Sequence, residues 1–278
     1  ARVAQPDMTG DHMEQPVSAE EEEDGGDHEG LIIADNGGGR CSSLVGRPAR
    51  ASRGDPHPPP VKSDAASAVL LATCHDDEVK VRFAVAPGGL GFDSNQFVEF
   101  VDELERLRFD TLWLSDVPLG ATIDPLIGLA LAGGRTDRLK LGANLVPLGR
   151  HPYLLAKELA QLDRVSGGRL LLSLVPGLGQ PMERQLLGAE GSDRGRLIEG
   201  TMTLLRAFWS GGPVTHEGAG FACRDLVLPV LPVQQPLELW LGGNGPKALQ
   251  RVGVFADGWL GSAMTPPEAA TAVQTMSA

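Results

Sequence analysis

From Val81 onward, short apolar runs alternate with stretches whose apolar residues recur at helical spacing. The short runs are typical of strands buried on both faces, and the longer stretches are typical of amphipathic helices. The pattern predicts six strands, at Val81–Ala86, Thr111–Ser115, Leu139–Val146, Leu170–Val175, Leu237–Leu241 and Trp259–Ala263.

Residues that start and stop helices fall between these strands. Ser94 or Asn95 is suited to cap the first helix, and Asp124 followed by Pro125 starts the second. Further helices are predicted at Pro152–Val165, at Met182–Trp209 with an interruption near Gly188–Gly195, at Pro246–Phe255 and at Pro266–Met276, with a hairpin or extended excursion at Thr215–Val230.

This alternation of strands and helices predicts a parallel sheet. A doubly wound open sheet and a (β/α) barrel both satisfy the pattern, and the pattern alone does not separate them. The glycine-rich turn at Pro87–Gly91 lacks the G-x-G-x-x-G spacing of a dinucleotide-binding turn, so it lends the open sheet little support.

Residues 1–78 have no sustained apolar period. They contain the acidic run Glu20–Asp24, a glycine triplet at Gly37–Gly39 and a proline triplet at Pro58–Pro60. Such a composition buries too little apolar surface to offset the entropy of ordering the chain. We therefore expect a disordered acidic leader over 1–78 and one folded domain over 79–278. An acidic interaction tail, and a leader that is not native to the protein, are the alternatives.

The charge of the chain is concentrated in this leader. Ten of the 36 acidic residues but only one of the 24 basic residues lie in 1–30, so this segment carries −9 of the net charge of −12. The remainder is nearly neutral and has no basic run, which disfavours nucleic-acid binding.

Cys41, Cys74 and Cys223 have neither disulfide nor metal-ligand spacing, so we expect no metal site and a reducing, cytoplasmic setting. The apolar run Ala65–Cys74 is about ten residues long, whereas a membrane-spanning helix needs about 20. No membrane association is expected.

Four stretches, taken together and in order, resemble the bacterial luciferase-like monooxygenase family. They are LERLRFDTLWLSD at Leu104–Asp116, the segment from DPLIGLALAGGRTDRLKLGANLVPLGRHP to YLLAKELAQLDRVSGGR at Asp124–Arg169, RLIEGTMTLLRAFW at Arg196–Trp209, and LWLGGNGPKALQRVGVFADGW at Leu239–Trp259. The second and fourth stretches together are specific.

The resemblance implies a parallel (β/α) barrel of TIM type, with a cofactor at the carboxyl ends of the strands. It implies an oxidoreductase that transfers a hydride between this cofactor and a small organic substrate. The deazaflavin coenzyme F-420 is preferred over FMN, because GGNGPKAL followed by ADGW is similar to the deazaflavin branch. Relatives are often dimers, so a homodimer is allowed.

Six strands are two β/α units short of such a barrel. We therefore expect an incomplete, C-terminally truncated barrel whose first and sixth strands are open edges. Within the leader, only Leu31–Ala34 and Ala68–Ala72 are strand-like, and they are expected to be poor substitutes.

The resemblance makes Asp116 the candidate catalytic residue, at the end of the second strand, where a barrel presents functional groups. It would contact the ring edge of the cofactor or a substrate hydroxyl. Val117 replaces a His that is common in the family, which puts general acid–base chemistry in doubt. The alternative is a loop carboxylate that caps a backbone N–H.

Cofactor-binding candidates lie after three other strands. Asn144, Leu145 and Val146 end the third strand, where the family has a bulge with a non-proline cis peptide, here expected between Asn144 and Leu145. A plain buried strand end is the alternative.

Glycine-rich segments supply the other candidates. Backbone N–H groups of the turn Gly242, Gly243, Asn244 and Gly245, with Lys247, suit a phosphate at the start of a helix, and a plain turn is the alternative. Gly177 matches the third glycine of a family G-x-G-x-G pattern, whose first two positions here are Ser173 and Val175.

Two other functions stay open. A non-catalytic or degraded barrel relative is favoured by Val117 and Val175. An unrelated phosphate-binding barrel enzyme, such as an aldolase or isomerase, would need a catalytic Lys or Glu, and Lys140 and Glu238 lie within strands. His151 could reach the strand ends as a proton donor, although a His at that place more often only begins a helix.

Overall fold

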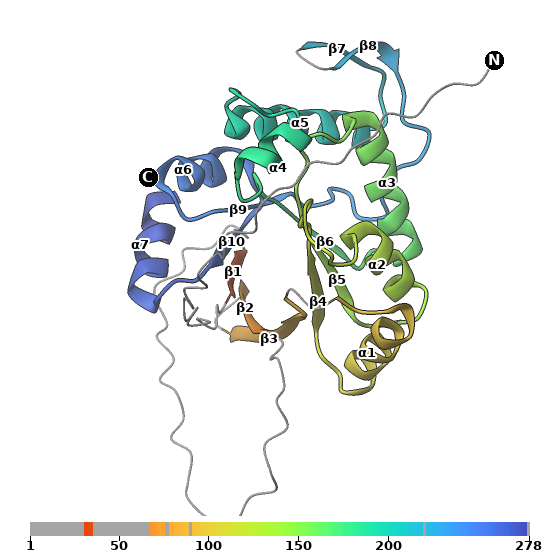
Figure 1. The fold of residues 1–278 in the computed structure, drawn as a ribbon, viewed down its shortest axis with the longest axis vertical. Coiled ribbons are helices and arrows are strands. Elements are labelled where there is room, and N and C mark those ends of the chain that lie inside the picture. The colour runs from red at the N-terminus through yellow and green to blue at the C-terminus, as the bar shows by residue number, and fades with distance from the viewer. Residues whose placement is uncertain (1–30, 36–66, 76–77, 89–90, 219–220, 277–278) are drawn as a thin grey trace, which may run out of the picture.

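The structure, a computed structural model, has strands at its centre and helices around them (Figure 1). It describes residues 31–35, 67–75, 78–88, 91–218 and 221–276. The strands are β1 Leu31–Asp35, β2 Ser67–His75, β3 Glu78–Ala86, β4 Thr111–Ser115, β5 Lys140–Leu145, β6 Leu170–Leu174, β7 Val214–Gly218, β8 Phe221–Leu226, β9 Trp240–Gly242 and β10 Gly258–Ser262. The helices are α1 Ser94–Arg106, α2 Pro125–Gly133, α3 Pro152–Val165, α4 Pro181–Leu186, α5 Arg194–Trp209, α6 Pro246–Phe255 and α7 Pro266–Met276.

All six predicted strands are present, as β3, β4, β5, β6, β9 and β10, and each is parallel to the next in that order. The predicted excursion is the hairpin β7–β8. Strand β9 is shorter than predicted. Leu239 instead pairs with Asp257, donating its N–H to the carboxylate at 2.8 Å and accepting the Asp257 N–H at 2.9 Å.

The sheet closes into a barrel in the order β1-β10-β9-β6-β5-β4-β3-β2. Six strands therefore form the parallel part of a TIM-type barrel, which confirms the predicted fold class. The predicted open edges are wrong. Strand β1 pairs antiparallel with β10 and parallel with β2, and β2 pairs antiparallel with β3.

Two segments of the expected leader are strands in the structure. The strand-like runs judged to be poor substitutes lie within β1 and β2. Their backbones supply the hydrogen-bonding partners that β3 and β10 would otherwise lack at an edge. The other calls on the leader fall on residues outside the described ranges.

Two apolar layers hold the barrel together. The larger layer lies between the strands and the helices. The smaller one comprises Ala84, Trp113, Trp240 and Leu260, from four different strands. Trp113 and Trp240 are 6.3 Å apart between ring centroids. A Cβ at Gly142 would overlap the Trp113 ring, so glycine makes room for this tryptophan.

Two helix starts fix the chain near the strand ends. Asp124 caps α2, as predicted, by accepting the N–H groups of Leu126 and Ile127. The cap of α1 is Asp93 instead of the predicted Ser94 or Asn95. Asp93 forms a reciprocal capping box with Gln96, which satisfies N–H groups at both positions.

Candidate functional site

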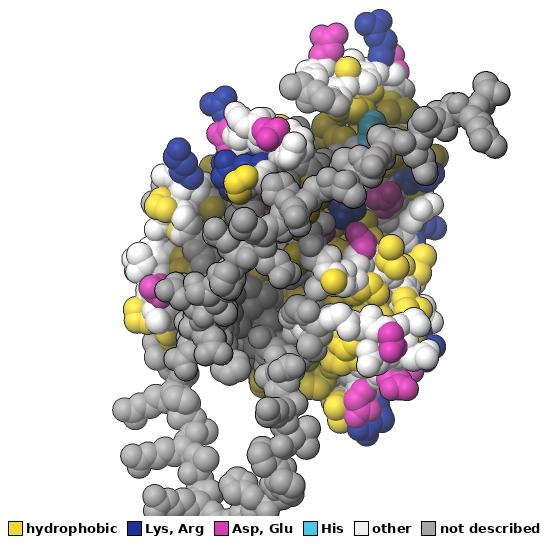
Figure 2. All heavy atoms as spheres, viewed as in Figure 1, with side chains coloured by type: hydrophobic (Ala, Val, Ile, Leu, Met, Phe, Trp, Pro, Cys, Tyr) yellow, Lys and Arg dark blue, Asp and Glu magenta, His cyan; other side chains and the backbone are white. Residues whose placement is uncertain are grey.

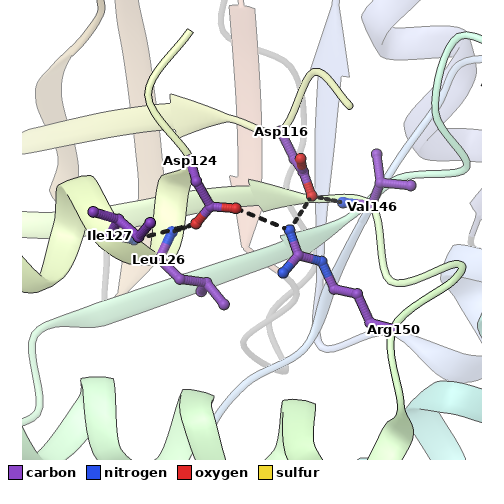
Figure 3. Close-up of polar contacts among 6 residues, drawn as sticks. All are labelled: Asp116, Asp124, Leu126, Ile127, Val146 and Arg150. Atoms are coloured by element: carbon purple, nitrogen blue, oxygen red, sulfur yellow. Dashed lines mark hydrogen bonds and ion pairs between the residues drawn. The ribbon is translucent and has the colours of Figure 1, made fainter. Parts of the chain in front are cut away.

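Asp116 lies directly after β4, at the carboxyl ends of the parallel strands. Its N–H donates to the carbonyl of Asn144 at 2.8 Å, which continues the pairing of β4 with β5. Its Oδ2 accepts the N–H of Val146 at 3.2 Å and a guanidinium N–H of Arg150 at 2.9 Å (Figure 3). The structure thus brings the candidates Asp116 and Val146 together.

Arg150 joins two carboxylates from the β4–α2 segment. Besides Asp116, it donates to Oδ2 of Asp124 at 3.2 Å (Figure 3). The Asp–Arg–Asp cluster therefore ties the loop after β5 to the loop after β4. Sequence reasoning missed Arg150. The available signal was a basic residue in a loop at the carboxyl end of a strand, where barrels place functional groups.

Burial raises the pKa of the Asp116 carboxyl above its ordinary value of 3.8. Arg150 and the Val146 N–H lower this pKa, and Asp124 adds to the rise. The Asp116 side chain is only 8% exposed. A buried carboxyl with a raised pKa in a cleft is suited to hold or accept a proton.

The end of β5 presents a polar group toward the inside of the barrel. Oδ1 of Asn144 and Oγ of Ser173, on the paired position of β6, are both buried, and neither has a hydrogen-bond partner among the described residues. Leu145 is fully buried and packs in the larger apolar layer. Asn144 and Val146 therefore lie at the candidate site, whereas the side chain of Leu145 does not reach it.

The predicted cis peptide between Asn144 and Leu145 is wrong. Among the described residues the cis bond is Gln235–Pro236. Strand β5 keeps regular parallel pairing to its end, with Leu145 opposite Leu174, and the Leu145 carbonyl accepts the Val175 N–H at 2.9 Å. A regular ladder leaves no bulge at this point.

The turn Gly242–Gly245 lines a cavity of about 460 Å³, here called the basic cavity. Gly243 has φ of +120°, a conformation that side chains rarely adopt. Asn244 donates its side-chain amide to the carbonyl of Ser262 at 2.5 Å. Gly245 is the N-cap of α6, whose N-terminus contributes positive potential.

Four basic side chains line the basic cavity, against one acidic residue, Asp193. Figure 2 shows Lys and Arg side chains gathered where α4, α5 and α6 lie. Lys247 was expected from the sequence. The others were missed: two come from segments far from the glycine turn in the chain, and the third lies on α6 itself, four residues after Lys247. The four are Arg184, Arg194, Lys247 and Arg251.

Gly177 does not line the basic cavity. A Cβ there would overlap the carboxylate of Glu183, and the Gly177 carbonyl accepts a hydrogen bond from Arg194 at 3.2 Å. Its neighbour Pro176 lines the cavity instead. The side chain of Val175, the residue after β6, packs against Gly242: a Cβ built on Gly242 would lie 2.5 Å from Cγ1 of Val175.

A separate cavity of about 440 Å³ lies beside Asp116, and we call it the Asp116 cavity. It is lined by the Asp–Arg–Asp cluster, by the β4–α2 loop and by the end of α4. His151 does not line it. The centroid of the His151 ring lies 4.9 Å from that of Phe221 in the β7–β8 hairpin. His151 is the N-cap of α3, as the favoured interpretation of a helix start predicted.

A family model described as luciferase-like monooxygenase matches residues 78–277. The chain is 31% identical over 205 residues to a limonene 1,2-monooxygenase of Rhodococcus erythropolis, covering 71% of this chain and 50% of that protein. It is 28% identical over 201 residues to an F-420-dependent glucose-6-phosphate dehydrogenase of Microbacterium testaceum, covering 68% of this chain and 59% of that protein. The chain thus spans half to three fifths of the length of these relatives.

Solved structures share the fold. A coenzyme F-420-dependent tetrahydromethanopterin reductase from Methanopyrus kandleri matches with a TM-score of 0.59 and 23% identity, over 69% of this chain and 58% of that one. A type II Baeyer–Villiger monooxygenase of Pseudomonas putida in complex with FMN matches with a TM-score of 0.52 and 17% identity, over 59% and 51%. Across the described ranges, no helix has the length and apolar character needed to cross a membrane.

Proposed function

The chain belongs to the luciferase-like monooxygenase family, and from that premise we propose that it is an oxidoreductase that transfers a hydride between F-420 or FMN and a small organic substrate. F-420 is preferred. The sequence GGNGPKAL followed by ADGW supports this preference, and so do relatives whose names specify F-420.

The observation that carries the proposal is the basic cavity beside Gly242–Gly245. Both cofactors carry a phosphate group, and glycine N–H groups at a helix N-terminus are suited to bind one. Arg184 and Lys247 are exposed, and neither forms an ion pair with the residues that the structure describes. These side chains fit the anionic end of such a cofactor.

Polar side chains on β5 and β6 that face the inside of the barrel are suited to contact the ring of the cofactor. A buried polar atom without a hydrogen-bond partner is costly, and a ligand is one way to satisfy it. Asn144 Oδ1 and Ser173 Oγ are two such atoms on neighbouring strands. They would accept or donate hydrogen bonds at the polar edge of a flavin-type ring.

When bound, either cofactor supplies the ring that accepts or donates the hydride. Asp116 accepts or donates the proton that accompanies hydride transfer. Its Oδ2 is held by Val146 and Arg150, and its Oδ1 accepts no hydrogen bond from the described residues. In the oxidation of an alcohol, Oδ1 takes the hydroxyl proton, and in the reduction of a carbonyl it returns that proton. The raised pKa of Asp116 suits both directions.

Titration of the full chain with F-420 and with FMN, followed by absorbance, tests the proposal. Gly243→Val should weaken affinity at least about tenfold, or about 1.4 kcal/mol, because a Cβ there is strained and 3.1 Å from that of Ala248. Gly200→Val on α5, where a Cβ meets open space, is the matched control. Unchanged affinity in a folded Gly243→Val variant would count against the phosphate role.

A non-catalytic relative is the second candidate, and the position of Val175 over Gly242 favours it. A bulky side chain at this place narrows the approach to the glycine turn. If the full chain bound neither cofactor and Val175→Gly gained binding, this alternative would replace the proposal.

A further inference from the structure

The Asp116 cavity differs from the basic cavity in the charge of its lining. Its lining combines polar groups with apolar side chains from the β4–α2 loop, the segment after β5 and the end of α4. The apolar ones include Pro118, Ile123, Val146, Leu148, Leu186 and Leu187. A concave site of this size with a few polar groups is the usual form of a small-molecule site.

The charges of the Asp116 cavity disfavour an anionic ligand. Among the described residues, Arg150 is the only basic side chain in its lining, and it already donates to both Asp116 and Asp124. Two carboxylates against one guanidinium leave a net negative charge, which repels a phosphate ester or a carboxylate. The free basic side chains lie in the other cavity.

Two polar atoms remain for a neutral ligand. Among the described residues, Oδ1 of Asp116 accepts no hydrogen bond and the buried Oγ1 of Thr122 has no partner. Together they offer one acceptor and one hydroxyl. A single ligand hydroxyl would satisfy both positions, because it donates to Oδ1 of Asp116 and accepts from Thr122. A ligand carbonyl would accept from Thr122, and from Asp116 when that carboxyl is protonated.

An apolar surface continues from the cavity along α4. Leu186 lines the cavity and is 57% exposed, and Met182, one turn earlier, is 68% exposed. Leu178, four residues before Met182, is 74% exposed. Leu186 is therefore the exposed apolar residue at the rim of the cavity, and Met182 lies on the same face of α4.

We infer that the Asp116 cavity takes the substrate, and that the substrate is an uncharged alcohol or ketone rather than a sugar phosphate. The inference rests on the proposed oxidoreductase function. Asp116 and Thr122 bind the single oxygen function, the apolar side chains bind the hydrocarbon part, and the net negative charge rejects anions.

Calorimetric titration of the full chain with menthol, with menthane, which lacks the hydroxyl, and with glucose 6-phosphate tests this assignment. Menthol should bind saturably, menthane about tenfold more weakly because the hydrogen bonds are lost, and glucose 6-phosphate at least about a hundredfold more weakly. Glucose 6-phosphate that binds as well as menthol, or no binding of menthol, would overturn the inference.

Two variants locate the ligand. Leu186→Gln should weaken menthol binding about fivefold, whereas Val254→Gln, at a more exposed apolar site on α6, should not. Thr122→Val should weaken menthol binding yet leave thermal stability equal or higher, because it removes an unpartnered buried hydroxyl. Equal effects of the two Gln variants, or unchanged menthol affinity in Thr122→Val, would place the ligand elsewhere.

Cofactor titrations on the same preparations separate the two ideas. A chain that binds F-420 or FMN but not menthol overturns this inference alone. A chain that binds menthol but neither cofactor overturns the proposed function, and the assignment of the cavity to a substrate falls with it.

Discussion

Among single residues, Asp116 shows how burial changes the pKa of a carboxyl group. Burial raises its pKa above the ordinary 3.8, so the folded chain holds this proton more tightly than the unfolded chain does. The resulting stabilisation is fully present below the ordinary pKa and is lost as the pH rises through the raised one. Asp116→Asn resembles the protonated acid and lacks this loss.

We therefore predict that the free energy of unfolding of the native chain falls, relative to that of Asp116→Asn, as the pH rises from below 3.8 through the raised pKa. Urea denaturation at a series of pH values measures this difference. Glu99→Gln, at an exposed site on α1, controls for the loss of a carboxylate. Parallel curves for the native chain and Asp116→Asn would contradict the predicted direction.

Residue-level reasoning found the groups that follow strands and missed those that only the fold assembles. Asp116 and the turn Gly242–Gly245 were predicted because a barrel presents groups at strand ends. Arg184 and Arg194 reach the same cavity as that turn from α4 and α5. No local pattern marks such residues, since their proximity depends on how helices pack.

At the scale of elements, one buried carboxylate fixes the segment before β9. Asp163 on α3 is fully buried and accepts the N–H groups of Val233 and Gln234 at 2.7 and 2.9 Å, and the Gln234 side-chain amide at 2.7 Å. This segment leads into the strand that carries Gly242. The position of the glycine turn therefore depends on α3.

We predict that Asp163→Ala lowers the free energy of unfolding by about 3 kcal/mol or more, because it leaves several donors without a partner. Urea denaturation measures the loss. Glu158→Ala, at an exposed site on the same helix, should stay within about 0.5 kcal/mol. Equal, small effects of both variants would show that Asp163 does not anchor the segment.

Most elements were predictable from the sequence, because the period of the apolar residues and the residues that cap helices indicate the same element boundaries. The second helix is an example, with Asp124 as its cap and Pro125 in its first turn. The start of β9 was not predictable, because it depends on the contact of Leu239 with Asp257, 18 residues later. The regular end of β5 also differs from the cis bond that the family resemblance implies.

At the scale of the whole molecule, the barrel closes through two strands that precede the matched family segment. Sequence reasoning recognised both apolar runs but rejected them, since short runs in an acidic, Gly- and Pro-rich stretch offer weak evidence of order. In the structure, β1 and β2 nevertheless pair with β10 and β3, whose backbone N–H and C=O groups would otherwise lack partners at an edge. Edge pairing is a property of the assembled sheet, which local patterns do not record.

Strand β1 lies between β10 and β2, with Ile33 opposite Leu260 on one side and Leu71 on the other. We predict that Ile33→Pro lowers the free energy of unfolding by about 1–3 kcal/mol, because proline removes a ladder N–H. It should also increase binding of a hydrophobic dye. Ile33→Val keeps the N–H and is the control. If Ile33→Pro unfolded like the native chain, the closure by β1 would be wrong.

The central claim is that the strand ends and the N-terminus of α6 hold a flavin-type cofactor. Amide hydrogen exchange of the full chain, with and without F-420 or FMN, tests this most directly. We predict slower exchange at Gly242–Ala248 and at Asn144–Val146 when the cofactor is present, with no change in the β7–β8 hairpin. Protection confined to other segments, or none at a cofactor concentration that saturates binding, would contradict it.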